Sequence, residues 1–173
     1  MKTLFYLISF ITLPLFSTTE NVINSFEYNI EVEQKVEVNL FKELTEVNDS
    51  IINVIAYIES RMNVKAEGDN GKAFGILQMW DIAVQDHNRL FKTNYVHKDS
   101  YNKEKSYLMC RNLLNYGIKY YHKKCGEYPT MIELMRMWNG NIYSGWNKQG
   151  TIKYVRKYSE LQSEINNYFC YDF

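Results

Sequence analysis

The side chain best suited to chemistry in this 173-residue chain is Glu59, which lies within an otherwise apolar helical stretch. On a helical wheel of about 100° per residue, Ile52 and Ile55 fall on either side of Glu59, at roughly +20° and −40°. A solvated helix face therefore explains Glu59 poorly. A carboxyl group surrounded by hydrocarbon resists ionisation, so it can hold a proton for transfer at neutral pH. That is the state of a general acid; the alternative is a buried Glu paired with a nearby base.

Four short motifs follow the Glu59-Ser60 pair along the chain. They are Gly68-Asp69-Asn70-Gly71, Gly75-Ile76-Leu77-Gln78, Trp138-Asn139-Gly140-Asn141 and Gly150-Thr151-Ile152-Lys153-Tyr154-Val155. Together with Glu59-Ser60 they resemble the lysozyme-like lytic transglycosylases, meaning the soluble lytic transglycosylase family and its goose-type lysozyme relatives. In that superfamily a Glu-Ser pair ends a helix, and a Gly-Leu-Met-Gln strip packs beneath the sugar cleft. A Tyr-Asn-Ala-Gly motif and a Glu-Thr-x-x-Tyr-Val helix start come later. The resemblance covers about residues 46–160.

Two positions depart from the family pattern. Asn141 replaces the small residue that closes the third motif, so we expect residues 142–149 to shape the adjacent part of the cleft differently. Gly150 replaces an acid, so whatever that acid anchors in the family is absent here.

The resemblance implies cleavage of the β-1,4 bond between N-acetylmuramic acid and N-acetylglucosamine in peptidoglycan. Glu59 would act as acid and then as base, and a transglycosylase would leave a 1,6-anhydro end. The close alternative is a hydrolytic, goose-type-like lysozyme, for which Asp69 is the possible second carboxylate, with Asp81 behind it. An Asp in a Gly-flanked turn also commonly caps its own backbone. Alternatives of another class are a non-catalytic cell-wall-binding module and a secreted interaction protein.

Four side chains are expected to bind substrate or to position Glu59. Ser60 would donate a hydrogen bond to the sugar, and the Gln78 amide would hold the floor of the cleft. Asn139 suits an N-acetyl group, because an amide both donates and accepts. Tyr154 is expected to direct its hydroxyl toward Glu59. A helix-end hydroxyl, surface exposure and aromatic packing are the ordinary alternatives for Ser60, Gln78 and Tyr154.

Helices must position these side chains. Asn48-Asp49-Ser50 offers N-caps for a helix over residues 51–62. Apolar residues at three- and four-residue spacing predict a helix over residues 103–124. Thr130 and Glu133 form a capping-box pattern before a helix over residues 131–138, and Thr151 would cap a last helix to about residue 168. A partial alternation at residues 28–38 is the one strand-like pattern. These patterns predict a single, mainly α domain. The resemblance implies that this is a lysozyme-like helical domain, which would follow a signal peptide.

The expected domain boundaries follow from composition. Residues 1–19 combine a positive start, an apolar run at 4–16 and small residues, which is the layout of a signal peptide. A membrane span needs about 20 apolar residues, so an uncleaved anchor is the lesser alternative. Residues 20–45 are expected to be an acidic linker or arm, and residues 46–173 the catalytic domain. Export to the periplasm or the exterior follows from this layout.

Charge and cysteine content narrow the partners. Residues 20–50 hold eight acids and two bases, whereas residues 51–173 hold 17 bases and 12 acids. This excess of bases suits an anionic polymer such as a cell wall, and export disfavours nucleic acid. Cys110 and Cys125 are separated by 15 residues of predicted helix, which would hold them about 22 Å apart, too far for a disulfide. Cys170 is the partner if one bridge forms, and three free thiols are the alternative.

No metal site and no cofactor are expected, because the chain has no CxxC motif and its three histidines are scattered. The expected partner is the peptidoglycan glycan strand, bound by a monomer with no stable membrane span.

Overall fold

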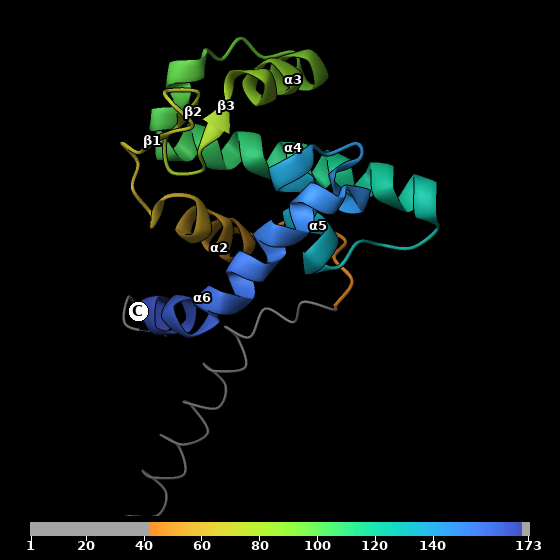
Figure 1. Ribbon diagram of the computed structural model, residues 1–173. Coiled ribbons are helices and arrows are strands. Elements are labelled where there is room, and N and C mark those ends of the chain that lie inside the picture. Colours follow the sequence, from red (N-terminus) through yellow and green to blue (C-terminus); the bar gives the residue numbers. More distant parts are fainter. Residues whose placement is uncertain (1–41, 171–173) are drawn as a thin grey trace, which may run out of the picture. The chain divides into compact units, whose positions relative to one another are not determined.

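Helices make up most of residues 42–170, the part of the chain that this computed structural model describes (Figure 1). The expectation of a mainly α domain is therefore confirmed. The expected signal peptide, the arm before residue 42 and the strand pattern at residues 28–38 lie outside the described residues. In chain order the elements are α2 (Asp49–Ser60), β1 (Glu67–Gly68), β2 (Ala73–Phe74), β3 (Met79–Trp80), α3 (Asp81–Phe91), η1 (His97–Tyr101), α4 (Lys103–Cys125), α5 (Met131–Gly140), η2 (Gly145–Asn147), η3 (Gln149–Thr151) and α6 (Ile152–Cys170).

α2 begins at one of the N-caps that the sequence predicts. The side chain of Asn48 accepts a hydrogen bond from the Ile51 N–H at 3.0 Å, which satisfies one of the free donors at a helix N-terminus. The helix ends at Ser60, before the predicted residue 62, because Arg61 and Met62 adopt left-handed φ values of 53° and 65°. Glu59 thus lies at the last turn of α2.

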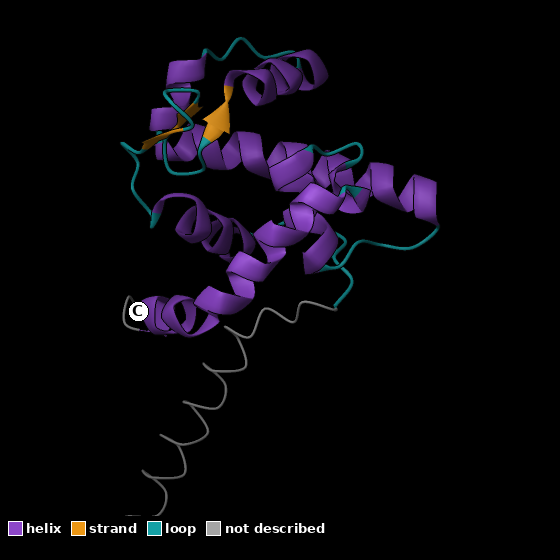
Figure 2. Cartoon of the chain, in the orientation of Figure 1, coloured by secondary structure: helices purple, strands orange, loops and turns teal. Residues whose placement is uncertain are grey.

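A small antiparallel sheet of order β1-β2-β3 follows α2 (Figure 2). The sequence did not predict it, because strands of two residues are too short to show an alternating pattern. The Gly75-Ile76-Leu77-Gln78 strip forms the turn between β2 and β3. Gly75 has a φ of 74°, and a Cβ there would collide with the Ser100 carbonyl oxygen, so this turn requires glycine.

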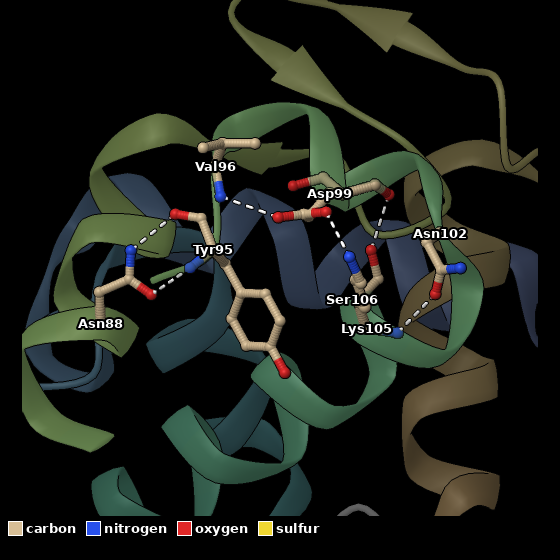
Figure 3. Close-up of polar contacts among 8 residues, drawn as sticks. Asn88, Tyr95, Val96, Asp99, Asn102, Lys105 and Ser106 are labelled. Carbon is tan, nitrogen blue, oxygen red and sulfur yellow. Dashed lines mark hydrogen bonds and ion pairs between the residues drawn. The ribbon is translucent and has the colours of Figure 1, made fainter. Parts of the chain in front are cut away.

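Polar side chains hold α3 and η1 in place beside α4 (Figure 3). The Asn88 amide on α3 donates to the Tyr95 carbonyl oxygen at 2.7 Å and accepts from the Tyr95 N–H at 2.9 Å. In η1, the Asp99 carboxylate accepts from Lys105 Nζ at 2.6 Å. Asn102 caps α4 by accepting from the Lys105 N–H at 2.9 Å. Side-chain bonds therefore fix α3 to the loop that follows it and η1 to the start of α4.

α4 and α5 confirm two predicted helices. α4 covers the predicted residues 103–124 and ends one residue later, at Cys125. α5 opens with the predicted capping box, in which Glu133 accepts from the Thr130 N–H at 3.0 Å. The core lies where α2, α4, α5 and α6 pack together. Its fully buried side chains include Ile52, Ile55, Leu114, Ile118, Met131, Leu134, Met135 and Tyr158.

The chain between α5 and α6 is braced by Thr151. This residue directly precedes α6, as predicted, but its hydroxyl does not serve as the expected cap. The hydroxyl donates to the Lys148 carbonyl oxygen at 2.6 Å, and the Gly145 carbonyl oxygen lies 2.9 Å away. The hydroxyl also accepts from Arg136 Nε on α5 at 3.0 Å. Thr151 therefore ties the preceding loop to α5 instead of satisfying the N–H groups of α6.

Residues 43 and 44, which the sequence assigns to the acidic arm, pair with the chain just before α5. Glu43 forms an isolated antiparallel bridge with Thr130, and the Leu44 N–H donates to the Pro129 carbonyl oxygen at 2.8 Å. Within residues 42–170, no helix has both the length and the apolar character needed to cross a membrane.

Two of the three cysteines are free thiols in this structure. Cys110 is buried within α4, and Cys125 is exposed at its C-terminal end. Burial raises the pKa of the Cys110 thiol well above its ordinary value, so this thiol stays protonated. The side chain of Cys170, the partner considered for a bridge, lies outside the described part of the chain.

Candidate active site

A cavity of about 550 Å³ opens beside the last turn of α2. Glu59 lines it from α2, and Asp69 and Gln78 line it from the two turns of the sheet. α3 forms one wall, the end of α5 and the residues after it form another, and Leu113 of α4 contributes to the lining. Lys157 reaches the cavity from α6. The cavity beside the Glu59 carboxyl group is thus lined by residues from all five α-helices of the described chain and from the small sheet.

Glu59 is held by two hydrogen bonds to the same oxygen. The Tyr154 hydroxyl donates to Glu59 Oε1 at 2.8 Å, and the Trp138 indole N–H donates to the same Oε1 at 3.1 Å. The expected direction of the Tyr154 hydroxyl is confirmed. Tyr154 comes from the first turn of α6 and Trp138 from α5, so two separate helices orient the carboxyl group.

The surroundings of Glu59 favour its neutral form. Burial of the carboxyl raises the pKa of Glu59 to about 7, against the opposing effects of the Tyr154 hydrogen bond, the Lys157 charge and the Trp138 hydrogen bond. The charge of Asp69 adds a smaller increase to this pKa. A group with this pKa holds a proton in about half of the molecules at neutral pH and can both give and regain it.

The two donors also determine which oxygen of Glu59 carries the proton. An oxygen that accepts two hydrogen bonds has both lone pairs engaged. Oε1 is therefore the carbonyl oxygen of the neutral form, and the proton lies on Oε2. Among the described residues, Oε2 has no hydrogen-bond partner. Burial raises the pKa of Tyr154 far above its ordinary value as well, so this hydroxyl remains a donor.

Asp69 shares the cavity with Glu59. It lies in the tight turn between β1 and β2, with a left-handed φ of 50°. Its carboxylate does not cap this turn, which is closed by the Gly71 and Lys72 N–H groups donating to the Gly68 carbonyl oxygen. The Asp69 carboxylate accepts instead from the Trp80 indole N–H at 3.0 Å. Asp69 and Trp80 thus form a polar edge of the cavity.

Gln78 and Asn139 both line the cavity. Gln78 Nε2 donates to the Gly75 carbonyl oxygen at 2.8 Å, which folds the side chain onto its own turn. A Cβ at Gly68 would displace the end of the Gln78 side chain, so glycine at the end of β1 leaves room for this amide. Asn139 is exposed at the end of α5.

Ser60 has a different place from the one expected. Its hydroxyl donates to the Ile76 carbonyl oxygen at 2.8 Å and lies 3.3 Å from the Ala56 carbonyl oxygen. Ser60 does not belong to the residues that line the cavity. The hydroxyl therefore joins the end of α2 to the Gly-Gln turn. Asp81 also lies outside the lining, at the start of α3, where it accepts from Gln85 Nε2.

The sequence analysis missed three polar contributions to the lining: the Trp138 indole as a donor to Glu59, Lys157 and Asp86. Two of them left a signal in the sequence. Trp138 occupies the aromatic position of the third motif, and Lys157 lies three residues after Tyr154, on the same face of a helix. Asp86 left none, because α3 itself was not predicted.

The described residues contain no group of three or more His, Cys, Asp and Glu side chains that could hold a metal ion. His87 is buried by neighbours rather than placed for ligation. Thr93 Oγ1 lies 3.0 Å from its Nδ1, and Asn112 Nδ2 lies 3.1 Å from its Nε2. Burial lowers the pKa of His87, so the ring stays neutral. An Asn NH₂ group only donates, so Nε2 is the acceptor and Nδ1 carries the proton toward Thr93.

No protein-family model matches the chain, and neither a curated protein nor a solved structure matches it significantly. The chemistry of the site therefore has to be inferred from its own geometry.

Proposed function

We propose that this protein cleaves the β-1,4 bond between N-acetylmuramic acid and N-acetylglucosamine in peptidoglycan, as a lytic transglycosylase with a lysozyme-like domain. The observation that carries the proposal is the raised pKa of Glu59, about 7, which lets its carboxyl hold a proton at neutral pH. This carboxyl lines a cavity that also presents amides and aromatic rings. The order of the Glu-Ser, Gly-Gln, Asn-Gly and Tyr-Val motifs supports the same function. Export, expected from residues 1–19, would bring the enzyme to its substrate.

The reaction needs only one protein carboxyl group. Glu59 Oε2 gives its proton to the glycosidic oxygen, the bond from this oxygen to C1 of N-acetylmuramic acid breaks, and the N-acetylglucosamine part leaves as an alcohol. The N-acetyl oxygen of the muramic acid stabilises the cation at C1. The ionised Glu59 then takes the proton of the 6-hydroxyl, whose oxygen bonds to C1. The product is a 1,6-anhydro end, water is not consumed, and Glu59 regains its proton.

The neighbouring side chains have matching tasks. Tyr154 and Trp138 keep Oε1 engaged, so the proton-bearing oxygen has a fixed direction. They also stabilise the carboxylate that forms after the first transfer, since both donate to it. Asn139 is the amide available for the N-acetyl group. Gln78 retains its Oε1 as an acceptor, because its Nε2 is bound to Gly75.

Hydrolysis of the same bond is the second candidate function. It is favoured by the presence of a second carboxylate, that of Asp69, in the cavity. Asp69 lines the cavity that holds Glu59. An inverting hydrolase uses a second carboxylate to activate water on the opposite face of the sugar. The two reactions differ in their products, because an anhydro end is lighter by one water molecule than a reducing end.

The test is digestion of purified peptidoglycan by the wild type and by Glu59→Gln, with mass analysis of the released sugars. Anhydro products from the wild type and none from Glu59→Gln are expected, while the variant still pellets with the wall. Glu160→Gln, an exposed position on α6, is the matched control and should digest like the wild type. Unchanged digestion by Glu59→Gln would exclude Glu59 as the acid. If the wild type binds the wall but does not digest it, the protein would be a non-catalytic cell-wall-binding module.

A further inference from the structure

The side chain of Trp80 lines the cavity that holds Glu59 and is also exposed to solvent, with 43% of its surface accessible. Ile82, two residues later, is 64% exposed and lines the cavity as well. Single exposed apolar side chains are ordinary on a protein surface. Here an indole and an aliphatic side chain together give an apolar stretch to a cavity that otherwise presents amides and carboxylates. This stretch suits a ligand that has an apolar face.

The backbone of Trp80 is held on both sides. Trp80 ends β3, where it pairs with Ala73 of β2, and α3 begins at the next residue (Figure 1). Ala73 also pairs with Gly68 of β1, so these three residues form one row across the sheet. The side chains of such a row point to the same face. Because the other two members of the row are small, the indole has room to extend across the sheet.

Asp69 orients the indole. Trp80 Nε1 donates to Asp69 Oδ2 at 3.0 Å, and Asp69 directly follows β1. This hydrogen bond spans the sheet, from β3 to the turn beyond β1, so it fixes the direction of the ring. Lys72 Nζ lies 5.9 Å from the ring centroid, near the outer limit of a cation–π contact, and constrains the ring much less.

The turn that carries Asp69 is closed without its carboxylate. Asp69 and Asn70 have left-handed φ values of 50° and 57°, and the Gly68 carbonyl oxygen accepts from the N–H groups of Gly71 and Lys72. Among the described residues, the hydrogen bond from Trp80 is the one that the Asp69 carboxylate accepts. Asp69 therefore has a task in the cavity that does not require it to react.

Trp80 does not contact the reacting carboxyl group. Glu59 is bonded by Tyr154 and Trp138, and the charge of Asp69 makes the smallest of the contributions that shift the pKa of Glu59. The Trp80 ring therefore shares the cavity with Glu59 but can contribute to the reaction only by binding another part of the substrate.

We propose that Trp80 is a stacking platform for one N-acetylhexosamine ring of the glycan strand, next to the sugar whose bond Glu59 cleaves, and that Asp69 positions this platform. This inference rests on the proposed function and adds a binding site to it. A hexosamine ring presents C–H groups on its faces and hydroxyl and amide groups around its rim. It can therefore stack on the indole while its rim meets amides such as that of Asn139. Asp69 then acts through Trp80 and not on a water molecule.

The experiment measures binding without cleavage, in the Glu59→Gln background. Calorimetry gives the Kd for a peptide-free octasaccharide of alternating N-acetylglucosamine and N-acetylmuramic acid. Trp80→Ala should raise this Kd by about tenfold, because the whole platform is lost. Trp80→Phe keeps a ring but loses the N–H, and Asp69→Gly loses the acceptor while suiting the left-handed backbone. Each should raise the Kd by about threefold. Asp69→Asn retains an acceptor oxygen and should bind like the parent.

The combination of Trp80→Phe with Asp69→Gly should bind no more weakly than either change alone, because both remove the same hydrogen bond. Asn70→Gly, in the same turn and with the same left-handed backbone, is the matched control for Asp69→Gly. Phe91→Ala, an exposed ring at the other end of α3, is the control for Trp80→Ala. Neither control residue lines the cavity, so both variants should bind like the parent. Calorimetry reports stoichiometry separately from Kd, so a partly unfolded variant is recognised by its lower stoichiometry.

The outcomes separate this inference from the function on which it rests. If Trp80→Ala binds the octasaccharide like the parent, the platform is refuted. If Asp69→Gly binds like the parent, or if its effect adds fully to that of Trp80→Phe, Asp69 does not position the ring and the inference is overturned. Both results leave the proposed function standing, because that function is judged by the anhydro sugars that the wild type releases and Glu59→Gln does not. Absence of these sugars would refute the function even if the octasaccharide binds through Trp80.

Discussion

The Tyr154 hydroxyl donates to Oε1 of Glu59 at 2.8 Å, although the two residues are 95 positions apart in the chain. This bond joins the first turn of α6 to the last turn of α2. Because Trp138 bonds the same oxygen, the carboxyl group cannot rotate without losing two donors. The proton-bearing oxygen is therefore presented in one orientation, which is what transfer to a glycosidic oxygen requires.

Activity should decline as the pH rises through about 7. The proposed acid works only while Glu59 is protonated, and burial of its carboxyl raises its pKa to about 7. Above that pH, the protonated fraction falls by about tenfold for each pH unit. The measurement is kcat/KM on soluble peptidoglycan fragments from about pH 3.5 to 9. A decline centred near pH 4.5, the ordinary value for a glutamate, would contradict the buried state of Glu59.

The free energy of unfolding should depend on the same group. The pKa of Glu59 is higher in the folded protein, about 7, than its ordinary value of 4.5. Between these values the folded state retains a proton that the unfolded state has released, so stability falls as the pH rises. Glu59→Gln removes this effect. The variant should resemble the wild type below pH 4.5 and should be more stable at pH 8, by up to about 3 kcal/mol.

Urea denaturation at about pH 4 and about pH 8 measures this difference. Glu160→Gln serves as the control, since an exposed carboxylate on α6 should leave the pH dependence of stability unchanged. A Glu59→Gln variant that is equally stable or less stable than the wild type at the higher pH would mean that the ionised carboxylate is not penalised in the fold.

Tyr154→Phe should lower the rate and move the pH profile. Loss of the hydroxyl removes a hydrogen bond that lowers the pKa of Glu59, so this pKa should rise. The decline in activity should shift to higher pH, while kcat falls by about tenfold because Oε1 keeps only the Trp138 donor. A structural role in packing alone would change stability without moving the pH profile. Tyr120→Phe is the control from the aromatic side chains of α4.

Much of this arrangement could be anticipated from local patterns. The caps at Asn48 and Thr130 and the periodic apolar residues of α4 predicted three helices nearly to their observed ends. Glu59 stood out because its helical position conflicts with its charge. These signals lie within one or two helical turns, which is the distance over which a sequence pattern reports on structure.

The rest depends on contacts between distant segments. The two-residue strands exist because turns at Gly68 and Gly75 bring them together, and no pattern of that length is distinctive. Ser60 was expected to face substrate, and only the packed position of Ile76 shows where its hydroxyl bonds. Asp86 reaches the cavity because Asn88 and Tyr95 hold α3 in place. Such partners are set by tertiary packing and leave no local trace.

Asp69→Asn should distinguish the two reactions that the cavity allows. If Glu59 alone carries the chemistry, the variant should still form anhydro products. Its rate should change by less than about tenfold, because only a minor electrostatic contribution to the Glu59 pKa is lost. Since the Asp69 charge raises that pKa, the decline in activity should also move slightly to lower pH. The amide keeps an oxygen that can accept from the Trp80 indole, so this side-chain contact should persist.

A hydrolase that uses Asp69 as its base would lose about 100-fold or more of its activity, and the products it no longer forms would carry reducing ends. Mass analysis of the sugars, together with rates from about pH 5 to 9, therefore decides whether the second carboxylate of the cavity takes part in the chemistry.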